Sequence, residues 1–190
     1  MDLLKHAITV KGKVLPGDVL KVGSFLNQQI DVRLLAEMAK DIFARFCNCA
    51  VTKVLTVESS GIALACLTAQ FFNCNAVFAK KSKSNNIEGE MLSAECYSYT
   101  HKTANVLLVP REYIAPDDKV LFVDDFLAKG EALRAAVKLV KEAGATFVGA
   151  AIAIEKGFQG GGDALRKEGV DVYSLAIIDS MKPGEIVFRN

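Results

Sequence analysis

The chain has 190 residues, 51% of them hydrophobic, so it can bury a large core, and we expect one domain spanning residues 1–190. Its 23 basic and 22 acidic residues leave a net charge of +1, which argues against a general nucleic-acid binder. No run reaches the roughly 20 apolar residues of a membrane-spanning helix, and we expect no signal peptide, because the N-terminus lacks a basic start followed by a long apolar run.

The N-terminal half of the chain alternates helical and strand patterns. Residues 31–46 carry apolar side chains at helical spacing, and Asp31 is a suitable N-cap for that helix. Beyond it we expect a strand at 51–57, a turn at 58–61, a helix at 62–72 and a strand at 76–79.

The C-terminal half continues this alternation after a possible hairpin. Residues 93–100 and 104–109 could pair as an antiparallel hairpin. We then expect a strand at 119–123, a helix at 131–143 ended by Gly144, and a strand at 147–154. A glycine-rich loop at 157–162, a short helix at 163–168 and strands at 170–178 and 185–188 should follow. The alternation predicts an α/β fold with a mostly parallel, twisted sheet flanked by helices. In such sheets ligands bind beyond the carboxyl ends of the strands, where the strand order switches.

The stretch 120–132 carries the most informative chemistry. Four apolar residues predict a buried strand that delivers Asp124 and Asp125, and a small-residue turn around Gly130 then opens a helix. The helix N-terminus offers free N–H groups and a positive dipole end to a phosphate. The carboxylates suit sugar hydroxyls or a magnesium ion. The stretch therefore favours a site for a phosphorylated ribose over two solvated acids at an ordinary strand end.

Two further strand ends and a basic tract could serve the same chemistry. The turn 58–61 exposes backbone N–H groups to an anion, although a plain strand-to-helix connection also explains it. Lys156 could donate to a carbonyl ligand while Phe158 stacks on it, although an exposed loop lysine fits the pattern equally well. The tract Lys80–Lys83 is either a solvated loop or a mobile arm that closes over an anionic substrate.

The cysteines indicate a cytoplasmic protein with reduced thiols. Five cysteines form an odd set without the spacing of a disulfide framework. Cys47 and Cys49 could indicate a metal site, but the chain has only two histidines, His6 and His101, so we do not expect zinc.

Residues Asp124–Ala132 resemble the phosphoribosyl-diphosphate (PRPP) signature of the type I phosphoribosyltransferases. Four more segments, in the same order along nearly the whole chain, are similar to the bacterial xanthine-using branch of that family, namely 20–29, 57–63, 77–84 and 154–159. The resemblance implies the type I phosphoribosyltransferase fold, with a small hood built from the N- and C-terminal segments and a flexible antiparallel hairpin. It also implies a transferase of purine salvage, which moves 5-phosphoribose from PRPP to xanthine and releases xanthosine 5′-monophosphate (XMP) and diphosphate.

The resemblance further implies a cytoplasmic homodimer that uses Mg²⁺ together with PRPP and has no nucleic-acid or membrane partner. It assigns the catalytic positions that hold the ribose hydroxyls to Asp124 and Asp125. It assigns PRPP to Ser59, Ser60, Gly61, Lys81, Ala128, Lys129, Gly130, Glu131 and Ala132. It assigns xanthine to Leu20, Asn27, Lys156 and Phe158, with residues 1–30 contributing to the base-binding hood and 14–30 lying over the base. No protein side chain is assigned to a metal.

The signature departs from the family at two positions. Lys129 stands where most of the superfamily has a hydroxyl residue and where close relatives more often have asparagine, and Ala132 also lacks a hydroxyl. The phosphate must then be bound by backbone N–H groups and the helix dipole, to which Lys129 could add a cation.

Two other functions stay open from the sequence. One is a related phosphoribosyltransferase that acts on guanine, hypoxanthine or adenine. The other is a non-catalytic regulator that senses PRPP, although the roughly 30 N-terminal residues are too few for an added winged-helix domain. A generic dinucleotide binder is disfavoured, because the Gly-x-Gly-x-x-Gly turn after the first strand is missing.

Overall fold

The computed structural model describes residues 1–82, 89–98 and 103–189. Residue 83 of the basic tract, residue 84 of the segment 77–84, and residues 99 and 100 of the predicted hairpin lie outside the described residues. The helices are α1 (Asp2–Lys11), α2 (Val32–Phe46), α3 (Ile62–Phe72), α4 (Glu131–Glu142) and α5 (Gly161–Lys167), with short turns η1 (Gly23–Asn27), η2 (Cys47–Cys49), η3 (Arg111–Tyr113) and η4 (Gly157–Gln159). The strands are β1 (Lys13–Leu15), β2 (Val19–Lys21), β3 (Lys53–Val57), β4 (Asn75–Ala79), β5 (Met91–Ser98), β6 (Thr103–Pro110), β7 (Lys119–Leu127), β8 (Thr146–Lys156), β9 (Val172–Lys182) and β10 (Glu185–Phe188).

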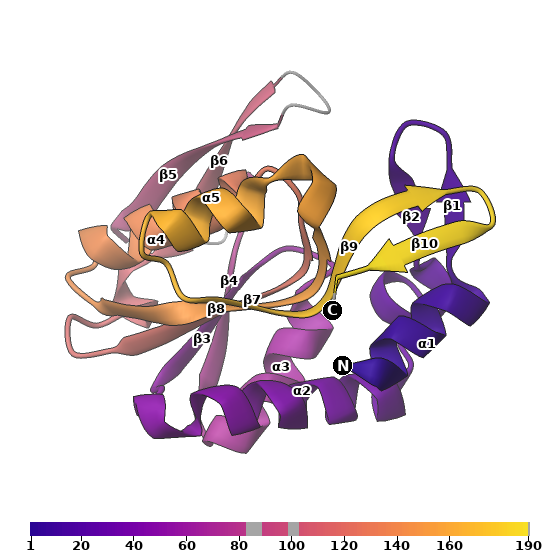
Figure 1. Cartoon of the computed structure of the whole chain (residues 1–190). Coiled ribbons are helices and arrows are strands. Elements are labelled where there is room, and N and C mark those ends of the chain that lie inside the picture. Colours follow the sequence, from indigo (N-terminus) through magenta and orange to yellow (C-terminus); the bar gives the residue numbers. More distant parts are fainter. Residues whose placement is uncertain (83–88, 99–102, 190) are drawn as a thin grey trace.

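The centre of the molecule is a mostly parallel sheet, as the sequence predicted. Within the described residues its strand order is β10-β9-β8-β7-β3-β4, and only β10 runs antiparallel to its neighbour. Helices α2 and α3 cover one face, while α4 and α5 cover the other (Figure 1). The chain runs from β3 to β4 toward one edge of the sheet, and from β7 through β8 and β9 toward the other edge. The switch in strand order therefore lies between β3 and β7. A ligand crevice is expected at this point.

Strand β7 is buried on both faces, which explains its unbroken apolar run. Val120 and Phe122 pack into the core beneath α4, whereas Leu121 and Val123 pack into the core beneath α2 and α3. Each face takes alternate residues because side chains alternate across a strand. This burial holds β7 rigidly, so it fixes the position of Asp124 and Asp125, which follow the apolar run within the same strand.

The chain termini meet at one end of the sheet. The hairpin β1–β2 lies beside the long β9–β10 hairpin, and the β5–β6 hairpin stands beside α4, away from these two hairpins (Figure 1). The amino group of Met1 donates to the carbonyl of Leu175 at 2.6 Å, and Lys5 Nζ donates to the carbonyl of Arg189 at 3.1 Å. The N-terminal segment is therefore attached to the C-terminal one.

Most predicted elements are confirmed, including the cap of α2. Asp31 Oδ1 accepts from the backbone N–H of Leu34 at 3.2 Å, and the β5–β6 hairpin is antiparallel. Several features differ from the prediction. Strand β7 continues to Leu127 rather than ending at Val123, and the expected loop 157–162 is mostly helical. The elements α1, β1, β2 and η1 were not anticipated. The single-domain organisation stays a prediction, and among the described residues no helix is long and apolar enough to cross a membrane.

Candidate active site

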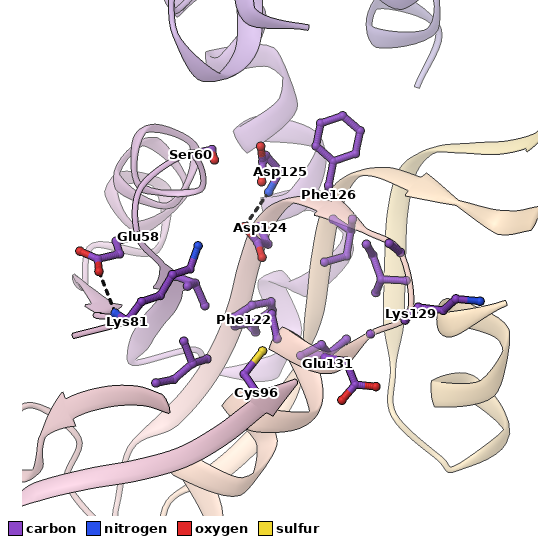
Figure 2. Close-up of a pocket in the computed structure, with 18 of the residues that line it drawn as sticks. Glu58, Ser60, Lys81, Cys96, Phe122, Asp124, Asp125, Phe126, Lys129 and Glu131 are labelled. Carbon is purple, nitrogen blue, oxygen red and sulfur yellow. Dashed lines mark hydrogen bonds between the residues drawn. The ribbon is translucent and has the colours of Figure 1, made fainter. Parts of the chain in front are cut away.

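A cavity of about 470 Å³ opens at the switch in strand order. It is bounded by the turn after β3, the end of β7, the loop before α4 and the hairpin β5–β6 (Figure 2). The residues that line it are Val57, Glu58, Ser60, Lys81, Cys96, Leu107, Phe122, Asp124, Asp125, Phe126, Leu127, Ala128, Lys129, Gly130, Glu131, Ala132, Leu133, Ile152 and Gln159. Segments far apart in the sequence therefore form one concave site.

Asp124 and Asp125 stand within β7 at the floor of this cavity. Each is only 8% exposed, and the backbone N–H of Asp125 donates to Asp124 Oδ1 at 2.9 Å. Burial, together with the negative charge of Asp125, raises the pKa of Asp124 well above its ordinary value. The extension of β7 explains this burial, because the acids belong to the strand and not to a solvated loop.

The turn between β3 and α3 reaches the same acids. A Cβ added to Gly61 would stand 2.8 Å from Asp124 Oδ1, so only glycine permits this close approach. The backbone N–H of Lys81 donates to Glu58 Oε1 at 2.7 Å, which ties the basic segment to the turn. Figure 2 shows the Lys81 side chain extending into the cavity toward Asp124.

The loop 128–130 and the start of α4 form an anion-binding geometry. Gly130, with φ +87°, is the N-cap of α4 and makes no side-chain capping hydrogen bond, so the first N–H groups of the helix are left without a side-chain acceptor. Lys129 lines the cavity, and its Nζ donates to the carbonyl of Gln159 at 3.3 Å, with the side chain directed away from Asp124 and Asp125 (Figure 2). The loop thus offers backbone N–H groups to a phosphate and carries one ammonium group beside them.

The predicted base-binding residues adjoin the cavity from the hood side. Asn27 Nδ2 donates to Asp125 Oδ2 at 3.2 Å, and Leu20 is buried in β2. Lys156 Nζ donates to the carbonyl of Asp18 at 2.8 Å and lies 5.5 Å from the ring centroid of Phe126. Burial lowers the pKa of Lys156, and the charge of Asp18 opposes that shift.

The predicted residues thus divide into two groups. Those that line the cavity are Ser60, Lys81, Asp124, Asp125, Ala128, Lys129, Gly130, Glu131 and Ala132. Those outside its lining are Leu20, Asn27, Ser59, Gly61, Lys156 and Phe158. Phe158 is 37% exposed on the turn η4, and its stacking on the base stays a prediction.

Sequence reasoning missed several lining residues. Phe126 forms part of the wall beside Asp125, and its position inside the signature was the available signal. Cys96 and Gln159 come from the hairpin and from η4, and only the folded chain brings them here. Burial and the carboxylate of Glu131 raise the pKa of the Cys96 thiol, so this cysteine is a poor nucleophile.

The family model that matches this chain is the phosphoribosyl transferase domain, over residues 21–181. A xanthine phosphoribosyltransferase from Bifidobacterium longum subsp. infantis is 50% identical and aligned over the full length of both chains. A xanthine phosphoribosyltransferase from Clostridium novyi is 47% identical, again over both full lengths.

Solved structures share the fold at lower identity. An adenine phosphoribosyltransferase from Giardia lamblia in complex with 9-deazaadenine superposes with a TM-score of 0.77 at 21% identity, over 92% of this chain and 96% of that one. The enzyme from Trypanosoma brucei in complex with AMP, pyrophosphate and ribose-5-phosphate gives a TM-score of 0.75 at 23% identity, over 92% and 78% of the two chains. At these identities the structures bear on the fold alone.

Proposed function

This chain belongs to the phosphoribosyl transferase domain family, and we propose that it transfers 5-phosphoribose from PRPP to xanthine, giving XMP and diphosphate. The observation that carries this proposal is the position of Asp125. Its carboxylate lines the cavity beside the phosphate loop and also accepts from Asn27, so the donor and base sides adjoin at one residue.

The donor side would bind PRPP through three groups of residues. The N–H groups of 128–132 and the dipole of α4 would hold the 5′-phosphate, with Lys129 adding a cation. Asp124 and Asp125 would accept hydrogen bonds from the ribose hydroxyls. The turn 59–61 and Lys81 would face the diphosphate. These contacts orient C1′ and stabilise positive charge on the ribose as diphosphate departs.

The charges in the cavity fit magnesium as a cofactor. Four carboxylates line it (Glu58, Asp124, Asp125 and Glu131) against two ammonium groups (Lys81 and Lys129). Such a lining does not neutralise a polyanionic substrate, so PRPP needs a bound cation. Among the described residues no cluster of three or more acidic, histidine or cysteine side chains is placed to hold a metal. Magnesium would therefore be held mainly by diphosphate oxygens and water, and it supplies charge neutralisation of the leaving group.

The base side would select xanthine through Lys156. Xanthine is more acidic than guanine or hypoxanthine, so a cation near its oxygens favours it. Lys156 Nζ is now held by a backbone carbonyl of the hood, at Asp18, and could turn from that carbonyl to a base oxygen. Asn27 would read the base edge, and Phe126 would lie under the base beside Lys156. A polar group that pairs with the 2-oxygen of xanthine disfavours guanine, which carries a 2-amino group at the same position.

The cellular setting follows from the same proposal. We place the enzyme in the cytoplasm as a homodimer, as the family resemblance implies. The five cysteines are all free in the structure, which agrees with a reducing compartment.

A spectrophotometric assay of PRPP with each purine, with and without magnesium, tests the proposal. We expect turnover that requires magnesium and is fastest with xanthine. Faster turnover with guanine, hypoxanthine or adenine would assign a related transferase instead. Tight PRPP binding without turnover of any base would favour a PRPP sensor.

A further inference from the structure

A chain of alternating charges lies behind the end of β8, which carries Lys156. Glu155 is fully buried, and both of its oxygens accept from Arg166, at 2.9 and 2.6 Å. Arg166 also reaches Asp163 at 3.2 Å, and Asp163 accepts from Arg189 at 2.8 Å. Arg189 then bonds Asp179 at 2.9 Å through Nε. The chain of charges joins the end of β8, helix α5, strand β9 and the segment after β10.

The buried end of this chain is adjacent to Lys156 in the sequence. Because successive residues of a strand point to opposite faces, Glu155 is directed to the α5 side while Lys156 is directed to the hood. The Glu155 carboxylate also accepts from Ser174 Oγ on the neighbouring strand. The backbone that presents Lys156 is therefore fixed from behind by three hydrogen bonds to a single carboxylate.

The exposed end of the chain of charges supports the next residue. A Cβ added to Gly157 would stand 2.9 Å from Arg189 Nη2 and 2.9 Å from Asp179 Oδ1, so the Gly157 backbone rests on this ion pair. Gly157 begins the turn η4, whose Gln159 lines the cavity and accepts from Lys129. A shift of Arg189 would be transmitted first to the backbone that presents Lys156.

We propose that Arg189 is a positioning residue for base selection, acting through the Asp163–Arg166–Glu155 chain and through the backbone of Gly157 to hold Lys156. This inference rests on the proposed function and deepens it. Arg189 itself does not line the cavity. Its guanidinium bonds Asp163 and Asp179 at once, which a lysine cannot reproduce with the same planar fork.

A purely structural role would predict a different result. The ion pairs of Arg189 are about one third exposed, and exposed pairs contribute little to stability. The buried core beneath β8 does not depend on them. Loss of Arg189 should therefore leave the fold intact and alter the geometry of the turn.

The test compares steady-state kinetics of Arg189→Ala with those of the wild-type chain. We expect kcat/KM for xanthine to fall roughly tenfold, since small displacements of a binding group are costly, while KM for PRPP stays within about twofold. The preference for xanthine over guanine should fall by a similar factor, because guanine depends less on Lys156. Asp163→Asn should change the preference in the same direction, and Arg189→Lys should restore part of it.

Arg45→Ala is the matched control. Arg45 is a partly exposed arginine that bonds both oxygens of one acid, Asp171, but at the amino end of β9, whereas Lys156 pairs with Ile178 farther along that strand. It should leave the base preference unchanged. An Arg189→Ala enzyme with wild-type preference, or one in which every substrate loses rate together with a lower Tm, would overturn the inference. If the wild-type chain does not use xanthine at all, the proposed function fails instead.

Discussion

The donor side and the base side of the site are assembled in different ways. The donor side is built mainly on one continuous segment, in which β7, the loop 128–130 and α4 follow each other directly, and the turn 59–61 and Lys81 complete it. The base side gathers Asn27 from η1 and Lys156 from the end of β8, whose side chains reach Asp125 and Phe126 of β7. The donor geometry is therefore mostly local, whereas base selection depends on long-range contacts of the hood. Changes on the two sides should have separable effects.

The largest effect is expected from Asp125→Asn on the donor side. The amide removes a negative charge that would face the ribose, so we expect kcat/KM for PRPP to fall by about 10²–10³-fold, or roughly 3–4 kcal/mol of transition-state stabilisation. The amide oxygen of the new asparagine can still accept from Asn27, so the loss should be the same with every base that is offered. Initial rates with xanthine and guanine measure it, with circular dichroism as the control for folding. A loss confined to one base would contradict the assignment.

Lys156→Ala tests the base side. We expect kcat/KM for xanthine to fall about 30-fold, roughly 2 kcal/mol, with smaller losses for guanine and hypoxanthine. KM for PRPP should stay near the wild-type value, because Lys156 lies outside the cavity lining. Rates equal to those of the wild-type enzyme with all three bases would remove Lys156 from base selection.

Lys129→Ala should have a smaller effect on the donor side. The backbone N–H groups of the loop remain, so we expect KM for PRPP to rise only about fivefold, or roughly 1 kcal/mol, and the difference to shrink at high salt. Lys138→Ala, an exposed lysine on the outer face of the same helix, is the control and should change nothing. Equal KM values for both variants would show that Lys129 does not meet the phosphate.

The smallest effect concerns stability. Because the folded-state pKa of Asp124 is raised above its ordinary value of 3.8, ionising it costs the folded state stability as the pH rises from that value through the folded pKa. Asp124→Asn should therefore be about 1 kcal/mol more stable at neutral pH, and the gain should vanish in acid. Thermal unfolding across pH measures this difference. A variant less stable at neutral pH would mean that the charged acid stabilises the fold.

The two sides also differ in what the sequence could predict. The strand, acids and glycine turn of 120–132 are adjacent in the chain, so pattern alone predicted a phosphate and ribose site. Lys156 was a candidate from its position at a strand end, whereas Asn27 came only from the family resemblance, because periodicity does not say that η1 and the end of β8 meet. The burial of Asp124 was not predicted, because the two acids were interpreted as the end of a strand. The approach of Gly61 to Asp124 is a tertiary contact that the sequence pattern does not reveal. The buried Glu155 and its link to Arg189 also depend on distant segments.

The ratio of kcat/KM for xanthine to kcat/KM for guanine, measured in parallel for the wild-type chain, Asp125→Asn and Lys156→Ala, tests the central claim most directly. The account predicts that Asp125→Asn lowers both values and leaves the ratio unchanged, whereas Lys156→Ala lowers the ratio and leaves KM for PRPP unchanged. A ratio that falls equally in both variants, or in neither, would contradict the separation of donor and base sides.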